Sequence, residues 1–226
     1  MDLTKKKKDD AAYQEVKEAI DLHIATLVEG KAQARTLLDY LTYTVQNPGA
    51  KITWALLIQG TQGNGKSFLY SLMEKALGVG NASTTDAAEL QGEFNGFAHG
   101  SQLVFIEDMQ FQGRGKHAAW GRIKSLVSSE SLVIRVRYRE RYTAPNLTNY
   151  VLLTNDTAKI PLSEEDRRFY VVRTKQQSRA DVLRDMPIGY FDTLFSVLEH
   201  PRDIRRYFQE RKVSDAFEPK GAAPIK

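Results

Sequence analysis

A glycine-rich segment carries the strongest chemical signal in this sequence. It matches the pattern G-x-x-x-x-G-K-[ST], which is typical of loops that bind nucleotide phosphates. Glycines let successive backbone N–H groups approach phosphate oxygens, and the positive end of a following helix adds to the attraction. The segment is Gly60-Thr61-Gln62-Gly63-Asn64-Gly65-Lys66-Ser67, followed by Phe68. We expect ATP and Mg²⁺ as ligands, with Lys66 on the β/γ-phosphate oxygens and the Ser67 hydroxyl on Mg²⁺.

Two carboxylates follow the next apolar segment. Leu103–Ile106 has the length and composition of a buried strand, and Glu107 and Asp108 come directly after it. Ligands of α/β proteins bind where the carboxyl ends of parallel strands meet, so we expect both acids beside the phosphate loop. We assign the hydration shell of Mg²⁺ to Glu107 and the role of base for the attacking water to Asp108, and the reverse assignment stays open.

A third apolar segment ends in an amide instead of an acid. Tyr150–Leu153 is followed by Thr154 and Asn155. Since this segment repeats the pattern of the two strands before it, we expect Asn155 at the same sheet edge. Its side chain would hold the attacking water against the γ-phosphate. A plain turn residue is the alternative interpretation.

Two adjacent arginines precede the last predicted strand, Phe169–Val172. A guanidinium placed at the γ-phosphate of a neighbouring subunit stabilises the transition state and raises the rate by roughly 10³–10⁵. We expect either Arg167 or Arg168 to be this arginine finger. The alternative is a surface ion-pair cluster with Glu165 or Asp166.

Four further arginines occupy every second position between the acidic pair and the amide. We predict a strand over Leu132–Tyr138. Alternate residues of an extended chain point to one side, so arginines that continue this alternation would form a row, roughly 6.6–7 Å apart. That step resembles the phosphate spacing of an extended nucleic acid, and Tyr138 or Tyr142 could stack on a base. The four are Arg135, Arg137, Arg139 and Arg141. We expect DNA contact here; a solvated hairpin face and ion pairs between subunits stay as alternatives.

Helices and strands must position these residues. Apolar residues recur at helical spacing from Ala11 to Gln46, and Gly30 divides this run into two predicted helices. Ile52–Ile58, directly before the glycines, reads as a buried strand. Further helical patterns lie between and after the strands, at Lys66–Leu77, His117–Ser129 and Tyr190–Leu198. Strands that alternate with helices predict an α/β domain with a mostly parallel central sheet.

The composition fits one folded domain with an appendage. The chain has 226 residues, of which 42% are apolar, and its net charge of +4 permits an anionic partner. Cysteine is absent and no apolar run approaches bilayer length, so we expect a cytoplasmic protein without a membrane partner. We expect a flexible basic tail in residues 1–10, a helical lead-in in 11–49, an ATPase core in 50–175, and a C-terminal helical segment with a tail in 176–226.

The order of these parts resembles the superfamily 3 helicases of the AAA+ class. The likeness covers roughly residues 36–173 and is greatest to the helicase part of phage, plasmid and viral primase-helicases. Two strings add to it: Tyr40-Leu41 with Gln46-Asn47-Pro48-Gly49, and Asp166-Arg167-Arg168-Phe169. The resemblance implies a three-layer P-loop domain and an ATP-driven helicase of DNA replication, in the host cytoplasm where a phage encodes it.

The resemblance also implies a homo-oligomer, commonly a hexameric ring. ATP would lie between subunits, and a hairpin would grip single-stranded or forked DNA in the central channel. A primase or polymerase domain or protein is an expected partner. The family commonly has a lysine or histidine at the hairpin tip, where this chain has arginines and tyrosines, and Lys124 matches a lysine of the family pattern. Two alternatives stay open: a AAA+ loader or scaffold that binds ATP and DNA without unwinding, and a P-loop phosphotransferase.

Overall fold

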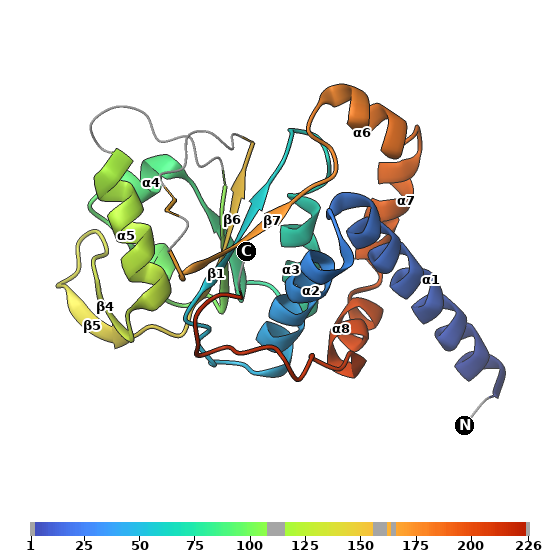
Figure 1. Cartoon of the computed structure of the whole chain (residues 1–226). Coiled ribbons are helices and arrows are strands. Elements are labelled where there is room, and N and C mark those ends of the chain that lie inside the picture. The colour runs from blue at the N-terminus through green and yellow to red at the C-terminus, as the bar shows by residue number, and fades with distance from the viewer. Residues whose placement is uncertain (1–2, 108–115, 156–161, 164–165, 225–226) are drawn as a thin grey trace.

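A five-stranded parallel sheet forms the centre of the protein in the computed structural model, which describes residues 3–107, 116–155, 162–163 and 166–224. The strand order is β2-β3-β6-β1-β7, of which Figure 1 labels β6, β1 and β7. The strands are β1 (Ala55–Gln59), β2 (Ala82–Thr85), β3 (Leu103–Ile106), β6 (Asn149–Thr154) and β7 (Phe169–Arg173). The predicted α/β class with a parallel sheet is confirmed. The polar strand β2 is the one member that the apolar pattern did not indicate.

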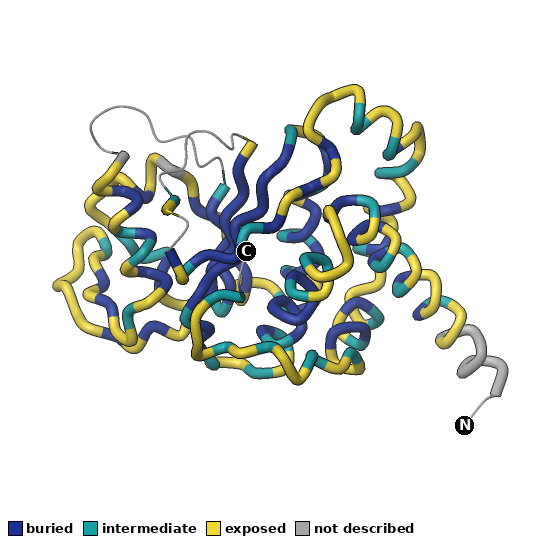
Figure 2. Tube along the Cα trace, viewed as in Figure 1, coloured by how far each residue is buried: buried dark blue, intermediate teal, exposed yellow. Residues whose placement is uncertain are grey.

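Helices cover both faces of the sheet and make three layers. One face carries α1 (Leu3–Leu27), α2 (Lys31–Gln46), α3 (Phe68–Leu77) and α8 (Pro201–Glu210). The other face carries α4 (Ala87–Gln91), the 3₁₀ turn Gly96–Ala98, α5 (Lys116–Ser128) and a hairpin of β4 (Ser131–Ile134) and β5 (Tyr142–Pro145). Alternate residues of each strand enter different cores, with Leu56 and Ile58 on the first face and Leu57 on the second. Burial on both faces explains the continuous apolar strands (Figure 2).

The predicted pair of N-terminal helices is confirmed. Gly30, with φ 86°, separates α1 from α2 as expected of a residue that adopts the left-handed region. Residues 3–10, where we expected a tail, continue α1 as helix in the structure. An ion pair of 3.3 Å between Asp10 and Arg206 of α8 ties this turn to the protein.

The C-terminal part packs back onto the domain. It contains α6 (Arg179–Asp185), α7 (Tyr190–Ser196), the 3₁₀ turn Val197–Glu199 and α8. The Tyr207 hydroxyl donates to Asp21 of α1 at 2.6 Å. The last residues cross the start of β1, where the Trp54 indole N–H donates to the Glu218 carbonyl at 2.9 Å. Of the helices that the structure describes, none has the length and apolar character needed to cross a membrane.

Candidate functional site

The phosphate-loop motif lies where its pattern predicts. Residues 60–67 connect the end of β1 to the start of α3, and the helix begins at Phe68, two residues later than predicted. Backbone hydrogen bonds anchor the loop at its start, since the Gly60 N–H donates to the Thr154 carbonyl at 3.2 Å. The N–H groups of residues 62–67 find no acceptor within the described part of the chain. A loop with free N–H groups ahead of a helix attracts anions.

Close packing explains why the loop has glycine at positions 60 and 65. A Cβ at Gly60 would lie 1.7 Å from the Thr174 hydroxyl, so Thr174, the residue after β7, would have to move. That hydroxyl in turn accepts a hydrogen bond of 2.9 Å from the Asn64 side chain. Gly65 has φ 83°, and a Cβ there would lie 2.6 Å from His23 of α1. These contacts hold the loop close to neighbouring elements, and only glycine fits.

The Lys66 side chain folds back onto its own loop. Its side chain is buried, and its ammonium donates to the carbonyls of Gly60 at 2.9 Å and Thr61 at 2.6 Å, and to the Asn64 side-chain oxygen at 3.0 Å. Burial lowers the pKa of Lys66 to about 8. A phosphate that took over one of these hydrogen bonds would stabilise the charged form.

A cavity of about 610 Å³ brings three of the predicted catalytic residues together, Lys66, Glu107 and Asn155. The phosphate loop from Gln62 to Phe68 forms one wall, with Glu107 and Asn155 also lining the space. Glu107 follows β3 and Asn155 follows β6, the adjacent strand, so both stand at the carboxyl edge of the sheet. The expected juxtaposition of these two residues with the loop is therefore present. Asp108 lies outside the described residues.

The residues at this cavity can hold Mg²⁺ only together with phosphate oxygens. Ser67 is exposed, and the Glu107 carboxylate is half-buried. Within the described residues, no three His, Asp or Glu side chains gather into a metal site. Mg²⁺ is usually held by one or two carboxylates plus substrate phosphates and waters, so one hydroxyl and one carboxylate suit a nucleotide-bound Mg²⁺ better than a permanent ion.

The two candidate finger residues lie at the opposite edge of the sheet. The Arg168 carbonyl accepts from Ala55, the first residue of β1, whereas the phosphate loop follows the last residue of that strand. The strand rises roughly 3.3 Å per residue, so the two edges are separated by about 15 Å, farther than an arginine side chain extends. Neither Arg167 nor Arg168 can reach the phosphate loop of its own chain.

The four alternating arginines do not form the predicted row. β4 ends at Ile134, so the strand expected over Leu132–Tyr138 is wrong beyond that residue. Residues 135–141 instead form the hairpin tip, because Tyr138 has φ 61° and the Arg139 N–H donates to the Val136 carbonyl at 3.3 Å, which turns the chain back. All four arginines remain exposed, and none forms an ion pair with another described residue. The tip thus presents a cluster of positive charge instead of a straight line.

The hairpin has a defined attachment to the domain. The Asn95 side chain accepts from the Arg135 N–H at 2.7 Å and donates to the Val133 carbonyl at 2.9 Å. The Arg137 guanidinium lies 5.4 Å from the centre of the Phe94 ring. Tyr138 is fully exposed at the tip, and Tyr142 is partly exposed. An exposed aromatic ring among arginines suits contact with single-stranded nucleic acid.

Other residues near the phosphate loop carry no signal in the sequence pattern. Phe191 and Phe195 of α7 complete the lining of the cavity, and the Phe195 ring packs edge-on against Phe68 at 5.5 Å. His23 of α1 is almost fully buried and lies within hydrogen-bonding distance of the Gly65 carbonyl. Its position on an apolar helix face predicts only a core residue, and the contact arises because α1 packs beside the loop.

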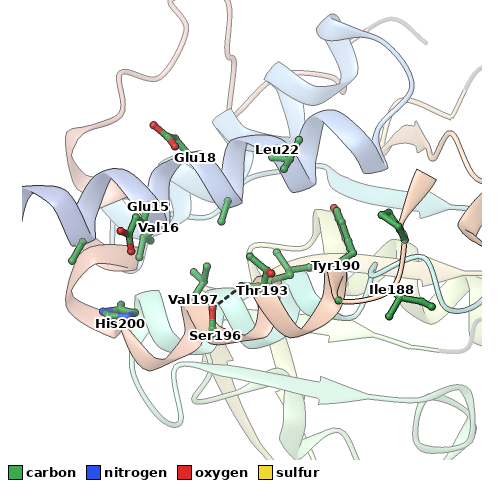
Figure 3. A pocket seen from close by; sticks show the side chains of 15 residues that line it. Glu15, Val16, Glu18, Leu22, Ile188, Tyr190, Thr193, Ser196, Val197 and His200 are labelled. Atoms are coloured by element: carbon green, nitrogen blue, oxygen red, sulfur yellow. Dashed lines mark hydrogen bonds between the residues drawn. The ribbon is translucent and has the colours of Figure 1, made fainter. Parts of the chain in front are cut away.

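A second cavity, of about 620 Å³, lies between α1 and residues 187–200, which include α7 (Figure 3). Its walls are largely apolar, with Val16 and Leu22 from α1 facing Ile188 and Val197. Tyr190 lines this groove and points toward α1. The groove contains none of the predicted site residues.

Known proteins share this fold. Residues 58–168 match a protein family described as a family of unknown function, DUF5906. The DNA primase-polymerase of Nitratiruptor phage NrS-1 is 22% identical over 191 residues, which cover 78% of this chain and 26% of that protein. The chain therefore spans about a quarter of this relative.

Solved structures extend the comparison. The C-terminal region of NrS-1 superposes with a TM-score of 0.75 at 20% identity, over 87% of this chain and 46% of that one. The JCV helicase superposes with a TM-score of 0.50 at 14% identity, over 88% of this chain and 60% of the helicase. The predicted likeness to phage and viral replication proteins is confirmed for the fold, and membership of superfamily 3 stays a prediction. The chain shares the three-layer fold of a phage primase-polymerase C-terminal region and a viral helicase.

Proposed function

We propose that this chain is the ATP-hydrolysing motor domain of a DNA helicase or translocase that acts in replication. The observation that carries the proposal is the cavity where Lys66, Glu107 and Asn155 meet beside a loop of free N–H groups. The fold shared with a phage primase-polymerase and a viral helicase supports a role in replication. A primase or polymerase region of the same polypeptide or a separate protein would be a natural partner.

The residues at the cavity have distinct roles in this proposal. The N–H groups of the loop and Lys66 would bind the phosphates of ATP, while Ser67 and Glu107 would hold Mg²⁺. That ion, when bound, neutralises charge that develops on the phosphate oxygens. Asn155 would orient the attacking water, and Asp108 remains our candidate for the base.

The position of the arginine pair supports shared sites between subunits. Arg167 and Arg168 cannot reach the phosphate loop of their own chain, so a finger role requires a neighbouring copy. A closed ring places one such pair at each interface. We propose a homo-oligomer, with a hexamer as the expected size, and single-stranded or forked DNA bound by the exposed arginines of the hairpin tip.

ATP hydrolysis measured with and without single-stranded DNA tests this function. Stimulation by DNA, together with a change in mass by light scattering when nucleotide is added, supports a motor. Phosphate transfer to a small molecule without any response to DNA would instead favour a phosphotransferase. A strand-displacement assay then separates a helicase from a loader that binds ATP and DNA without unwinding.

A further inference from the structure

We propose that His23 is a positioning residue for the phosphate loop and that it sets the orientation of the Gly65–Lys66 peptide for nucleotide binding. This inference rests on the proposed nucleotide site. His23 belongs to α1 and lies 42 positions before Gly65 in the sequence. The contact thus makes the N-terminal helix part of the nucleotide site.

The ring of His23 is held on both sides. Nε2 lies 3.3 Å from the Gly65 carbonyl oxygen, and Nδ1 lies 2.9 Å from the Tyr190 hydroxyl. A carbonyl can only accept, so it assigns the ring proton to Nε2, and Nδ1 then accepts from the tyrosine. The edge-on packing of His23 against Phe68, with ring centres 5.2 Å apart, fixes the ring further.

Tyr190, the titratable residue that contacts Nδ1 of His23, carries no charge. Tyr190 keeps its proton because burial raises its pKa. Burial also lowers the pKa of His23 to about 4, so that the imidazole is neutral near pH 7. A neutral ring can donate from Nε2 and accept at Nδ1, whereas a charged ring would have no acceptor for Tyr190.

The orientation of one peptide follows from this hydrogen bond. The Gly65 carbonyl accepts from His23 and from the Phe68 N–H at 3.1 Å. In a trans peptide the carbonyl and the next N–H point in opposite directions, so the Lys66 N–H points away from His23. This N–H is one of those without an acceptor in the described chain. Without His23, the Phe68 N–H alone would hold this carbonyl, and glycine, which populates both halves of φ space, would resist its reorientation least of all residues.

The amides of glutamine and asparagine separate this role from a purely structural one. A glutamine amide reaches the position of Nε2, and an asparagine amide reaches only that of Nδ1. His23→Gln should therefore keep the bond to Gly65, while His23→Asn should lose it. We expect His23→Asn to raise the KM for ATP by about three- to tenfold, the effect of one hydrogen bond, with kcat changed less than about twofold. His23→Gln should stay within about twofold of the wild type in both constants.

The controls distinguish the possible failures. His117→Leu alters an exposed histidine on α5 and should leave both constants and the melting temperature unchanged. A lowered kcat at unchanged KM in both His23 variants would mean only a smaller folded fraction and would overturn the positioning role. Equal KM values for the asparagine and glutamine variants would overturn it too. A wild-type protein that neither binds nor hydrolyses ATP would refute the proposed function, and the role of His23 with it.

Discussion

The Asp166 carboxylate lies 2.7 Å from the ammonium of Lys124, and this pair joins the start of β7 to helix α5. The carboxylate is 2% exposed and also lies 3.4 Å from the Arg168 guanidinium. Burial alone would raise its pKa, but the hydrogen bonds from Lys124 and the Arg168 N–H outweigh it and lower the pKa of Asp166. Lys124 therefore has a structural partner in this chain.

Removing that carboxylate should destabilise the protein. We expect Asp166→Asn to lower the free energy of unfolding by about 2–3 kcal/mol, because Lys124 loses a buried partner. The stabilisation should be present above the ordinary carboxyl pKa and lost as the pH falls below it, since the folded pKa is the lower one. Urea unfolding measures the difference. Asp215→Asn is the matched control, because that exposed carboxylate pairs with the exposed Lys212. An equal loss in both variants would contradict the prediction.

The two arginines after Asp166 should differ in function. Arg168 is held by Asp166, whereas the exposed Arg167 forms no ion pair with a described residue and is the better finger candidate. We expect Arg167→Ala to lower kcat for ATP by about 10³-fold and Arg168→Ala to have a smaller effect. Mixing Arg167→Ala with Lys66→Ala should restore part of the turnover, because some interfaces then combine one intact loop with one intact arginine. Steady-state hydrolysis of the mixture checks this, and no restoration would argue against shared sites.

Lys66 should control both turnover and the pH dependence of binding. Lys66→Ala should abolish hydrolysis, while Lys75→Ala, an exposed lysine on α3, should not. In the wild type, the affinity for ATP should fall as the pH rises through about 8, because the lysine loses its charge there and phosphate prefers the charged form. Titration of a fluorescent ATP analogue between pH 7 and pH 9 measures the effect, and retained turnover in Lys66→Ala would remove the phosphate-loop assignment.

The hairpin tip should bind nucleic acid through its charge. Replacing Arg137 and Arg139 with alanine should weaken binding of single-stranded DNA and reduce the slope of log K against log salt by roughly 0.7–1 per lost phosphate contact. The control replaces Arg179 and Arg202, two exposed arginines of the C-terminal part. Fluorescence anisotropy at several salt concentrations gives the slope. An unchanged slope would reduce the tip to a solvated hairpin.

His23 should also influence stability at acid pH. The pKa of His23 in the folded protein, about 4, lies below the ordinary value of 6.5. Between these two pH values the histidine is protonated in the unfolded chain and neutral in the folded protein. The stability due to this group is present above pH 6.5 and lost as the pH falls toward 4, by about 3 kcal/mol in all. We expect His23→Gln to lose less stability than the wild type between pH 7 and pH 4.5 in urea unfolding. Parallel losses in the two proteins would contradict the assignment of a neutral histidine.

The sequence predicts that the glycine-rich loop, Glu107 and Asn155 meet at one sheet edge, because local patterns on the strands β1, β3 and β6 place them there. The motif at residues 60–67 specifies its own conformation, and an apolar run followed by an acid or an amide places Glu107 and Asn155 at the same sheet edge. The parallel arrangement of the strands follows from their alternation with helices. For these residues, local pattern and general topology are sufficient.

Tertiary structure decided the features in which distant segments meet or a turn overrides a pattern. The alternation of arginines suggested a strand, but the left-handed Tyr138 and the attachment through Asn95 make a tip instead. The contact of His23 with Gly65 depends on the packing of α1 beside the loop, which helical spacing alone cannot specify. The sequence by itself thus determined the chemistry available at the sheet edge, because periodicity and motif spacing are local properties. Packing determined which groups hold that chemistry in place, because contacts between distant segments leave no periodic trace in the chain.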